Sequence, residues 1–78
     1  MNIAGVVLQT RPTDLATVQA QLETMAGVEV HGIHENGRLV VTVVEEGYRE
    51  TSDTVLRLHQ VPGVLNASLV YQHSEDIG

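Results

Sequence analysis

One pattern occurs twice in this chain, and the repeat constrains the fold more than any other feature. A shift of 36 residues superimposes the end of one helical segment on the end of another. The matched pairs are Leu22 with Leu58, Met25 with Val61, Gly27 with Gly63 and Val28 with Val64. Each half therefore predicts a strand, a helix, a Gly-Val exit and a second strand, which is the pattern of a split β-α-β unit.

The first half contains the signals for a strand, a helix and a strand. The run 3–10 is apolar and rich in β-branched residues, which favours a strand. Pro12 suits the first turn of a helix and disfavours helix at the residue before it. Apolar residues then recur at helical spacing, at Leu15, Val18, Leu22 and Met25. Gly27 predicts a left-handed cap, after which residues 28–35 form the second strand.

The second half begins with a hairpin and repeats the same order. Asn36-Gly37 is a strong hairpin signal because both residues accept positive φ. The strand 38–45 that follows is apolar on both faces, as is typical of the middle of a sheet. A helix is expected from Tyr48 to Pro62-Gly63, with Tyr48, Thr51, Val55 and Leu58 on one face. A last strand is expected over residues 64–72.

These elements predict the α+β class, as a ferredoxin-like βαββαβ fold. Its four-stranded antiparallel sheet has the spatial order 4-1-3-2, with two helices on one face and the other face open. Seventy-eight residues suffice for one core only. We therefore expect a single ferredoxin-like domain over residues 1–72 and a polar carboxy-terminal tail over residues 73–78.

Alternation of side chains along each strand assigns them to the two faces of the sheet. Under the helices we expect Val6, Leu8, Val28, Val30, Leu39, Val41, Val43, Ala67, Leu69 and Tyr71. On the open face we expect Gly5, Val7, Gln9, His31, Ile33, Val40, Thr42, Val44, Ser68, Val70 and Gln72, bordered by Glu29, Glu35, Glu45 and Glu46. An apolar patch with a polar border is a candidate interaction surface. A dimer contact through this face, or an ordinary half-apolar surface, stays open here.

Charge and cysteine content exclude several classes of function. Ten acidic residues stand against four arginines and no lysine, which gives a net charge of −6. Because nucleic acid is bound by basic surfaces, no nucleic-acid partner is expected, whereas a cationic partner stays open. The absence of cysteine excludes disulfide scaffolds, thiolate metal sites and thiol catalysis.

The amino-terminal segment shows no sign of export or membrane insertion. Met1-Asn2 supplies no basic region, and the apolar run 3–8 is too short for a secretory signal or a membrane span. We therefore expect a cytoplasmic protein with no stable membrane association. The lack of cysteine fits a reducing compartment.

The sequence does not indicate catalysis, a metal site or a cofactor. His31 and His34 are three residues apart in a strand, which predicts that they point to opposite faces, and His59 and His73 belong to other elements. No glycine-rich phosphate loop follows the first strand. Arg11 alone would support a ferredoxin-like acyl-phosphate hydrolase there. We expect that the chain is not an enzyme.

Several stretches resemble one known family, the NapD chaperones of periplasmic nitrate reductase. The most specific is the closing strand, residues 63–73, Gly-Val-Leu-Asn-Ala-Ser-Leu-Val-Tyr-Gln-His, which is followed by acids. Residues 5–11, Gly-Val-Val-Leu-Gln-Thr-Arg, are also similar to the family, as are residues 27–30 and residues 37–43. The resemblance covers almost the whole chain, although the acidic tail is shorter than in many relatives.

The resemblance implies a cytoplasmic chaperone that binds the twin-arginine signal peptide of NapA, the catalytic subunit of nitrate reductase. Binding would hold back export until cofactor insertion and folding are complete. Such a leader has two arginines followed by an apolar stretch, which an acidic protein with a half-apolar sheet face suits. The expected signal-peptide-binding residues are Val7, Val40, Thr42, Ser68 and Val70 as the floor, Gln9 and His31 as polar contacts, and Glu35, Glu45 and Glu46 for the arginine pair.

Two alternatives stay open. Ferredoxin-like domains often bind small molecules between paired subunits, so a dimeric regulatory module is the main rival function. The leader could also bind either as a helix across the sheet or as an added edge strand. Small residues at Gly5, Thr42 and Ser68 leave room for a helix, which we favour.

Overall fold

The computed structural model describes residues 1–74 of the chain. Its strands are β1 (Asn2–Thr10), β2 (Val28–His34), β3 (Arg38–Glu45) and β4 (Val64–Ser74), and its helices are the 3₁₀ turn η1 (Pro12–Asp14), α1 (Leu15–Glu23) and α2 (Tyr48–Gln60). This confirms the predicted element order. The last strand runs two residues further than expected, to Ser74, and the rest of the expected tail, 75–78, lies outside the described residues.

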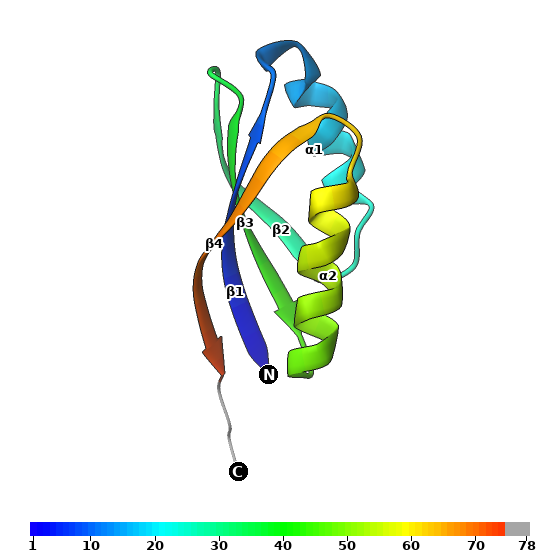
Figure 1. Ribbon diagram of the computed structural model, residues 1–78, viewed down its shortest axis with the longest axis vertical. Helices are drawn as coiled ribbons and strands as arrows, with labels where there is room; N and C mark the ends of the chain where they lie inside the picture. The colour runs from blue at the N-terminus through cyan, green and yellow to red at the C-terminus, as the bar shows by residue number, and fades with distance from the viewer. Residues whose placement is uncertain (75–78) are drawn as a thin grey trace.

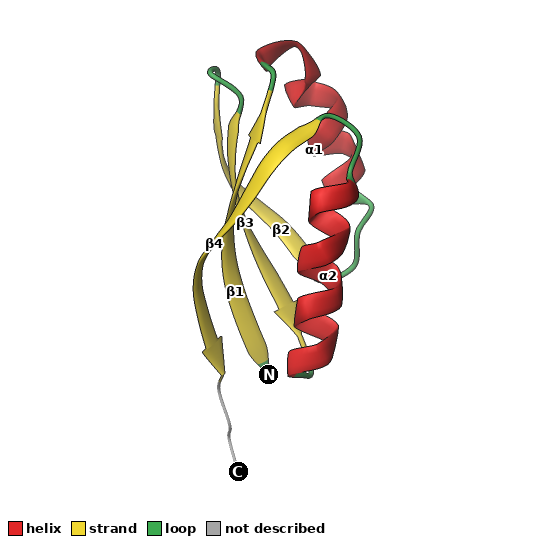
Figure 2. Ribbon diagram, in the orientation of Figure 1, coloured by secondary structure: helices red, strands yellow, loops and turns green. Residues whose placement is uncertain are grey.

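The four strands form one antiparallel sheet in the order β2-β3-β1-β4, which is the predicted order. Both helices lie on the same side of this sheet, to its right in Figure 1. The colouring by secondary structure in Figure 2 shows the same two layers, with no helix on the left side of the strands. The ferredoxin-like α+β fold is therefore confirmed, and one face of the sheet is left bare.

Both repeats enter the strand after the helix through the same kind of β-turn, although the helices themselves end in different conformations. Gly27 and Gly63 both have positive φ, 81° and 98°, at the third position of this β-turn. The sequence predicted Gly27 as the cap of the first helix, but α1 already ends at Glu23 with Thr24 as its cap, so the glycine belongs to the turn. In each repeat the following valine closes the turn: the N–H of Val28 donates to the Met25 carbonyl at 3.3 Å, and that of Val64 to the Val61 carbonyl at 3.1 Å. The 36-residue repeat in the sequence therefore corresponds to a repeated β-turn in the backbone.

The hairpin between β2 and β3 differs from the expected two-residue turn. Three residues, Glu35 to Gly37, connect the strands, and only Gly37 has positive φ, at 96°. The Gly37 N–H donates to the His34 carbonyl at 3.0 Å, and the Asn36 side chain accepts from the Arg38 N–H at 3.2 Å. Asn36 thus supports the turn through its side chain, and a single glycine supplies the left-handed residue of a three-residue hairpin loop.

The core lies between the helices and the sheet. Its buried apolar side chains are Ala4, Val6, Leu8, Val18, Leu22, Leu39, Val41, Val43, Leu58 and Val61. The sheet contributes alternate residues of β1 and β3, as the period of two predicts. Every buried side-chain N or O atom in the described residues has a hydrogen-bond partner; the Thr51 hydroxyl, for example, donates to the Gly47 carbonyl at 2.9 Å.

Two leucines of α2 provide a test of this core. Leu58 is fully buried, whereas Leu56 is 59% exposed on the same helix. We expect Leu58→Ala to lower the free energy of unfolding by about 2–5 kcal/mol, because it removes core contacts and leaves a cavity. We expect Leu56→Ala to change it by less than about 0.5 kcal/mol. Urea unfolding of both variants measures the difference, and equal losses would contradict the proposed packing of α2.

Candidate functional site

The face turned away from the helices is defined by strand register. Gly5 pairs with Thr42 and Val7 pairs with Val40 across β1 and β3, while the residues between them are buried under the helices. The open-face residues are, strand by strand, Ile3, Gly5, Val7 and Gln9; Glu29, His31, Gly32 and His34; Arg38, Val40, Thr42 and Val44; and Asn66, Ser68, Val70, Tyr71 and His73. This face is the left side of the sheet in Figure 1.

A β-bulge in β4 moves two residues to the faces opposite those expected. Leu69 pairs with Val6, but Tyr71 pairs with Gly5, so Val70 is an additional residue between these pairs. Tyr71, which was expected under the helices, therefore lies on the open face. Gln72, which was expected on the open face, pairs with Ala4 on the helix side. Strict alternation fails here because a bulge lengthens only one of two paired strands.

A second bulge, in β2, corrects two further expectations. His31 is the additional residue, and beyond it Ile33 pairs with Leu39 on the helix side instead of lying on the open face. His34 pairs with Arg38, so both histidines are on the open face, although their spacing predicted opposite faces. A bulge again shifts the alternation by one position.

The centre of the open face is apolar. A cavity of about 110 Å³ is lined by Gly5, Val6, Val7, Val40, Val41, Thr42, Val70 and Tyr71. It brings together four of the five residues expected to form a binding floor, and Ser68 pairs with Val7 beside it. Val70, the extra residue of the edge strand β4, is 63% exposed where it lines this cavity, and with Val7, Val40 and Tyr71 it forms a contiguous apolar surface, which is the kind of patch that marks an interaction site.

Tyr71 is the aromatic residue that strand alternation placed on the wrong face. Its ring lies across Gly5, since a Cβ atom at position 5 would overlap ring atoms of Tyr71. The side chain is nevertheless about half exposed. One signal for this contact was present in the sequence, because an isolated glycine within a strand marks a place where another group approaches the backbone closely.

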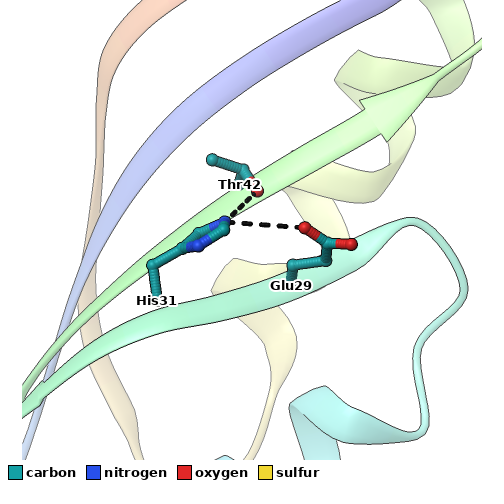
Figure 3. Close-up of polar contacts among 3 residues, drawn as sticks. All are labelled: Glu29, His31 and Thr42. Atoms are coloured by element: carbon teal, nitrogen blue, oxygen red, sulfur yellow. Dashed lines mark hydrogen bonds and ion pairs between the residues drawn. The ribbon is translucent and has the colours of Figure 1, made fainter.

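His31 forms a polar cluster on the β2 side of the apolar centre (Figure 3). Its Nε2 atom lies 2.7 Å from the Thr42 hydroxyl and 3.7 Å from a carboxylate oxygen of Glu29. The side chains of His31 and Glu29 are 50% and 70% exposed, so both are accessible to a ligand. The structure thus brings together two of the expected contacts, His31 and Thr42, with Glu29, which was expected only at the border.

Gln9 lies at the hairpin end of the open face. Its side-chain amide donates to the carbonyls of Thr10 and Asn36, each at 3.2 Å. The amide nitrogen therefore connects β1 to the β2–β3 turn. Neither of these two bonds uses the side-chain oxygen of Gln9. Gln9 is thus at the margin of the expected binding surface.

The three glutamates expected to meet the arginine pair are not neighbours. Glu35 is in the β2–β3 turn and Glu46 follows the other end of β3, so the eight residues of β3, about 27 Å, separate them. Glu45 pairs with Asn2 and accepts a hydrogen bond from the Thr54 hydroxyl of α2 at 3.1 Å. Its carboxylate therefore faces the helix layer, although it was expected at the border of the open face.

Cavities larger than the one on the open face lie elsewhere in the described part of the molecule. The largest, about 610 Å³, follows β2 against α1; one of 450 Å³ lies between the end of α1 and α2; and an apolar one of 290 Å³ lies between α2 and β4. Within residues 1–74 no group of three or more His, Asp or Glu residues could hold a metal ion. No helix in that range is long and apolar enough to span a membrane.

Comparison with known proteins gives a consistent result. The family model described as "NapD protein" matches residues 1–76. "Chaperone NapD" of Escherichia coli K12 and that of Shigella flexneri are each 30% identical over 78 residues, which covers 99% of this chain and 90% of theirs. The solution structure of the E. coli Tat proofreading chaperone protein NapD superimposes with a TM-score of 0.85 at 30% identity, over 97% of this chain and 81% of that one.

The contact between Tyr71 and Gly5 can be tested by adding one methyl group. We expect Gly5→Ala to displace the exposed ring, which raises acrylamide quenching of Tyr71 fluorescence and lowers the free energy of unfolding by about 1 kcal/mol. The measurement uses a Tyr48→Phe background, because the chain has two tyrosines and no tryptophan.

Gly32→Ala is the matched control on the same face. A Cβ atom there would lie 3.7 Å from the Cβ of Val40, which is ordinary van der Waals contact. We therefore expect no change in quenching for this variant. Equal quenching in both alanine variants would contradict the placement of the ring over Gly5.

Proposed function

This chain belongs to the NapD family, whose named relatives are chaperones, and on that premise we propose that it binds a twin-arginine signal peptide on the open face of its sheet. The peptide would be the leader of NapA, the catalytic subunit of periplasmic nitrate reductase. Binding in the cytoplasm would hold back export until cofactor insertion and folding are complete. Because chaperones are not enzymes, family membership confirms that the chain is not an enzyme.

The observation that carries this proposal is the exposed apolar centre of a sheet face that neither helix covers. Val7, Val40 and Val70 surround a cavity there, and Tyr71 adds a half-exposed ring. The apolar stretch of a leader would bury this surface, at about 25 cal/mol per Å² before the cost of ordering the peptide. Apolar contact therefore supplies most of the affinity in this proposal.

Charge supports a cationic ligand. The chain has a net charge of −6, and Glu29 presents an exposed carboxylate on the open face. An acidic protein attracts a leader that carries two arginines, which speeds their encounter and makes it sensitive to salt. Contacts of single exposed carboxylates are worth only about 0.2–1 kcal/mol each, so charge adds selectivity to an affinity that is mainly apolar.

We propose that the leader binds as a helix lying on the open face. Beneath it would lie Thr42 and Ser68 between the valines, and the Tyr71 ring, which covers Gly5 and fills the space that the sequence had assigned to the helix at that position. An amphipathic or apolar helix places side chains in such a surface with a spacing of three and four residues. The edges of the sheet, β2 and β4, offer the alternative of strand addition, which amide chemical shifts of a bound labelled leader distinguish from a helix.

The apolar part of the proposal is tested by Val70→Glu. We expect this substitution to abolish measurable leader binding by calorimetry, because it places a carboxylate in the apolar centre, while thermal unfolding stays close to that of the wild type since Val70 is exposed. Leu56→Glu is the matched control, because Leu56 is equally exposed but lies on α2. Unchanged affinity of the Val70 variant would rule out the open face as the binding surface.

The cationic part is tested with the peptide. A leader in which both arginines are replaced by glutamine should bind about 2- to 30-fold more weakly at low salt, as expected for the loss of two charge-assisted contacts. Raising the ionic strength should reduce this difference, because exposed charges are screened. Equal affinities of the two peptides at low salt would contradict an electrostatic contribution.

A further inference from the structure

One register row crosses the whole open face. Glu29 pairs with Thr42, Thr42 pairs with Gly5, and Gly5 pairs with Tyr71, so each of the four strands contributes one residue. The two inner residues are small, and the two outer residues carry longer side chains of different chemistry. Because the Tyr71 ring lies over Gly5, the row presents a carboxylate on the β2 side and an aromatic ring that reaches from β4 over β1.

We infer that this row, Glu29, Thr42, Gly5 and Tyr71, is where the two arginines of the leader are recognised. The carboxylate of Glu29 pairs with one guanidinium group, and the ring of Tyr71 stacks against the other. This inference rests on the proposed function and adds to it the residues that distinguish arginine from other cations. In this inference neither Glu35 nor Glu46 binds the arginine pair, because the two glutamates lie at opposite ends of β3.

A helix that runs along the strands can contact both ends of this row. The backbones of Glu29 and Tyr71 are three strand spacings apart, about 14 Å, and the Tyr71 ring reaches inward over Gly5, so a helix about 10–12 Å wide rests on the ring and has Glu29 at its side. Consecutive residues of a helix point about 100° apart. When the helix turns its arginine pair toward the sheet, one side chain therefore extends toward β2 and the other toward β4.

Tyr71 has the features of a stacking platform for a guanidinium group. Its ring is held over the backbone of Gly5 and yet is half exposed, so one side of the residue is supported and another is accessible. Guanidinium is planar and weakly hydrated and stacks on aromatic rings, whereas the ammonium group of lysine is compact and strongly hydrated. A tyrosine at this position therefore favours arginine over lysine. A carboxylate alone distinguishes the two cations only through the geometry of its hydrogen bonds.

Glu29 is the carboxylate in the right place for the second guanidinium. Its side chain is 70% exposed, and its contact with His31 is 3.7 Å long, so an arginine can displace or share it. His31 in turn is held by the Thr42 hydroxyl at 2.7 Å, which keeps the imidazole beside the row. The three side chains are drawn together in Figure 3, on neighbouring strands.

The experiment measures dissociation constants of three leader peptides, with Arg-Arg, Lys-Lys and Gln-Gln at the pair. We expect Tyr71→Leu to weaken binding of the Arg-Arg leader by about three- to tenfold and that of the Lys-Lys leader by less than about twofold, because leucine keeps the apolar contact but not the ring. Tyr71→Phe keeps the ring and should preserve the preference for arginine. Glu29→Gln should weaken binding of the Arg-Arg leader by about two- to fivefold.

Two sets of variants serve as controls. Glu35→Gln and Glu46→Gln each remove an exposed carboxylate outside the row. Since an exposed carboxylate that does not contact the arginines contributes little to binding, the ratio of Arg-Arg to Gln-Gln affinity should stay within about twofold of the wild-type ratio. Gly5→Ala displaces the ring without removing it, so its effect and that of Tyr71→Leu should not add. Far-UV circular dichroism and thermal unfolding show that each variant is folded.

The outcomes separate this inference from the proposed function. If the wild type binds the leader but Tyr71→Leu weakens all three peptides equally, Tyr71 is an apolar contact only and the inference is overturned. A larger loss of arginine preference in Glu35→Gln or Glu46→Gln than in Glu29→Gln would overturn it as well. If no leader binds the wild-type protein, the proposed function fails, and the inference fails with it.

Discussion

The packing of Val18, Leu22 and Leu58 against alternate residues of β1 and β3 is the contact on which the rest of the structure depends. Two helices of nine and thirteen residues supply the cover, and both lie on one side of the sheet. This buries one set of strand residues and fixes the register, since a slip by one residue would turn every core side chain outward. The other face is bare because both helices pack against the same side of the sheet.

The two bulges give that bare face its chemistry. Each adds one residue to an edge strand, His31 in β2 and Val70 in β4. In β4 the extra residue brings Tyr71 onto the open face beside Val70, and in β2 it brings His31 within reach of Thr42. Bulges commonly redirect side chains near functional sites, and here both increase the size and polarity of the groups that border an otherwise small apolar centre.

The fold could be predicted from the sequence because its signals are local and mutually consistent. Helical spacing, Gly27 and Gly63 after the helices, and β-branched strands all indicated the same order of elements, which the structure confirms. The face of Tyr71, Gln72 and Ile33 could not be predicted, because a bulge is a property of two paired strands and alternation is counted along one. Glu45 differed from expectation for a related reason: its partner, Thr54, comes from another element.

Alternation also separates the requirements of stability from those of binding. Val41 is fully buried under the helices and its neighbour Val40 is exposed on the open face, so the same strand serves both purposes at adjacent positions. The open-face residues can therefore change with little cost to the core, as long as the backbone keeps its register. Gly5 is the exception, because a larger residue there would displace Tyr71 and alter the binding surface from within the central strand. The constraint on Gly5 thus comes from the surface above it, which distinguishes it from a glycine that the fold itself requires.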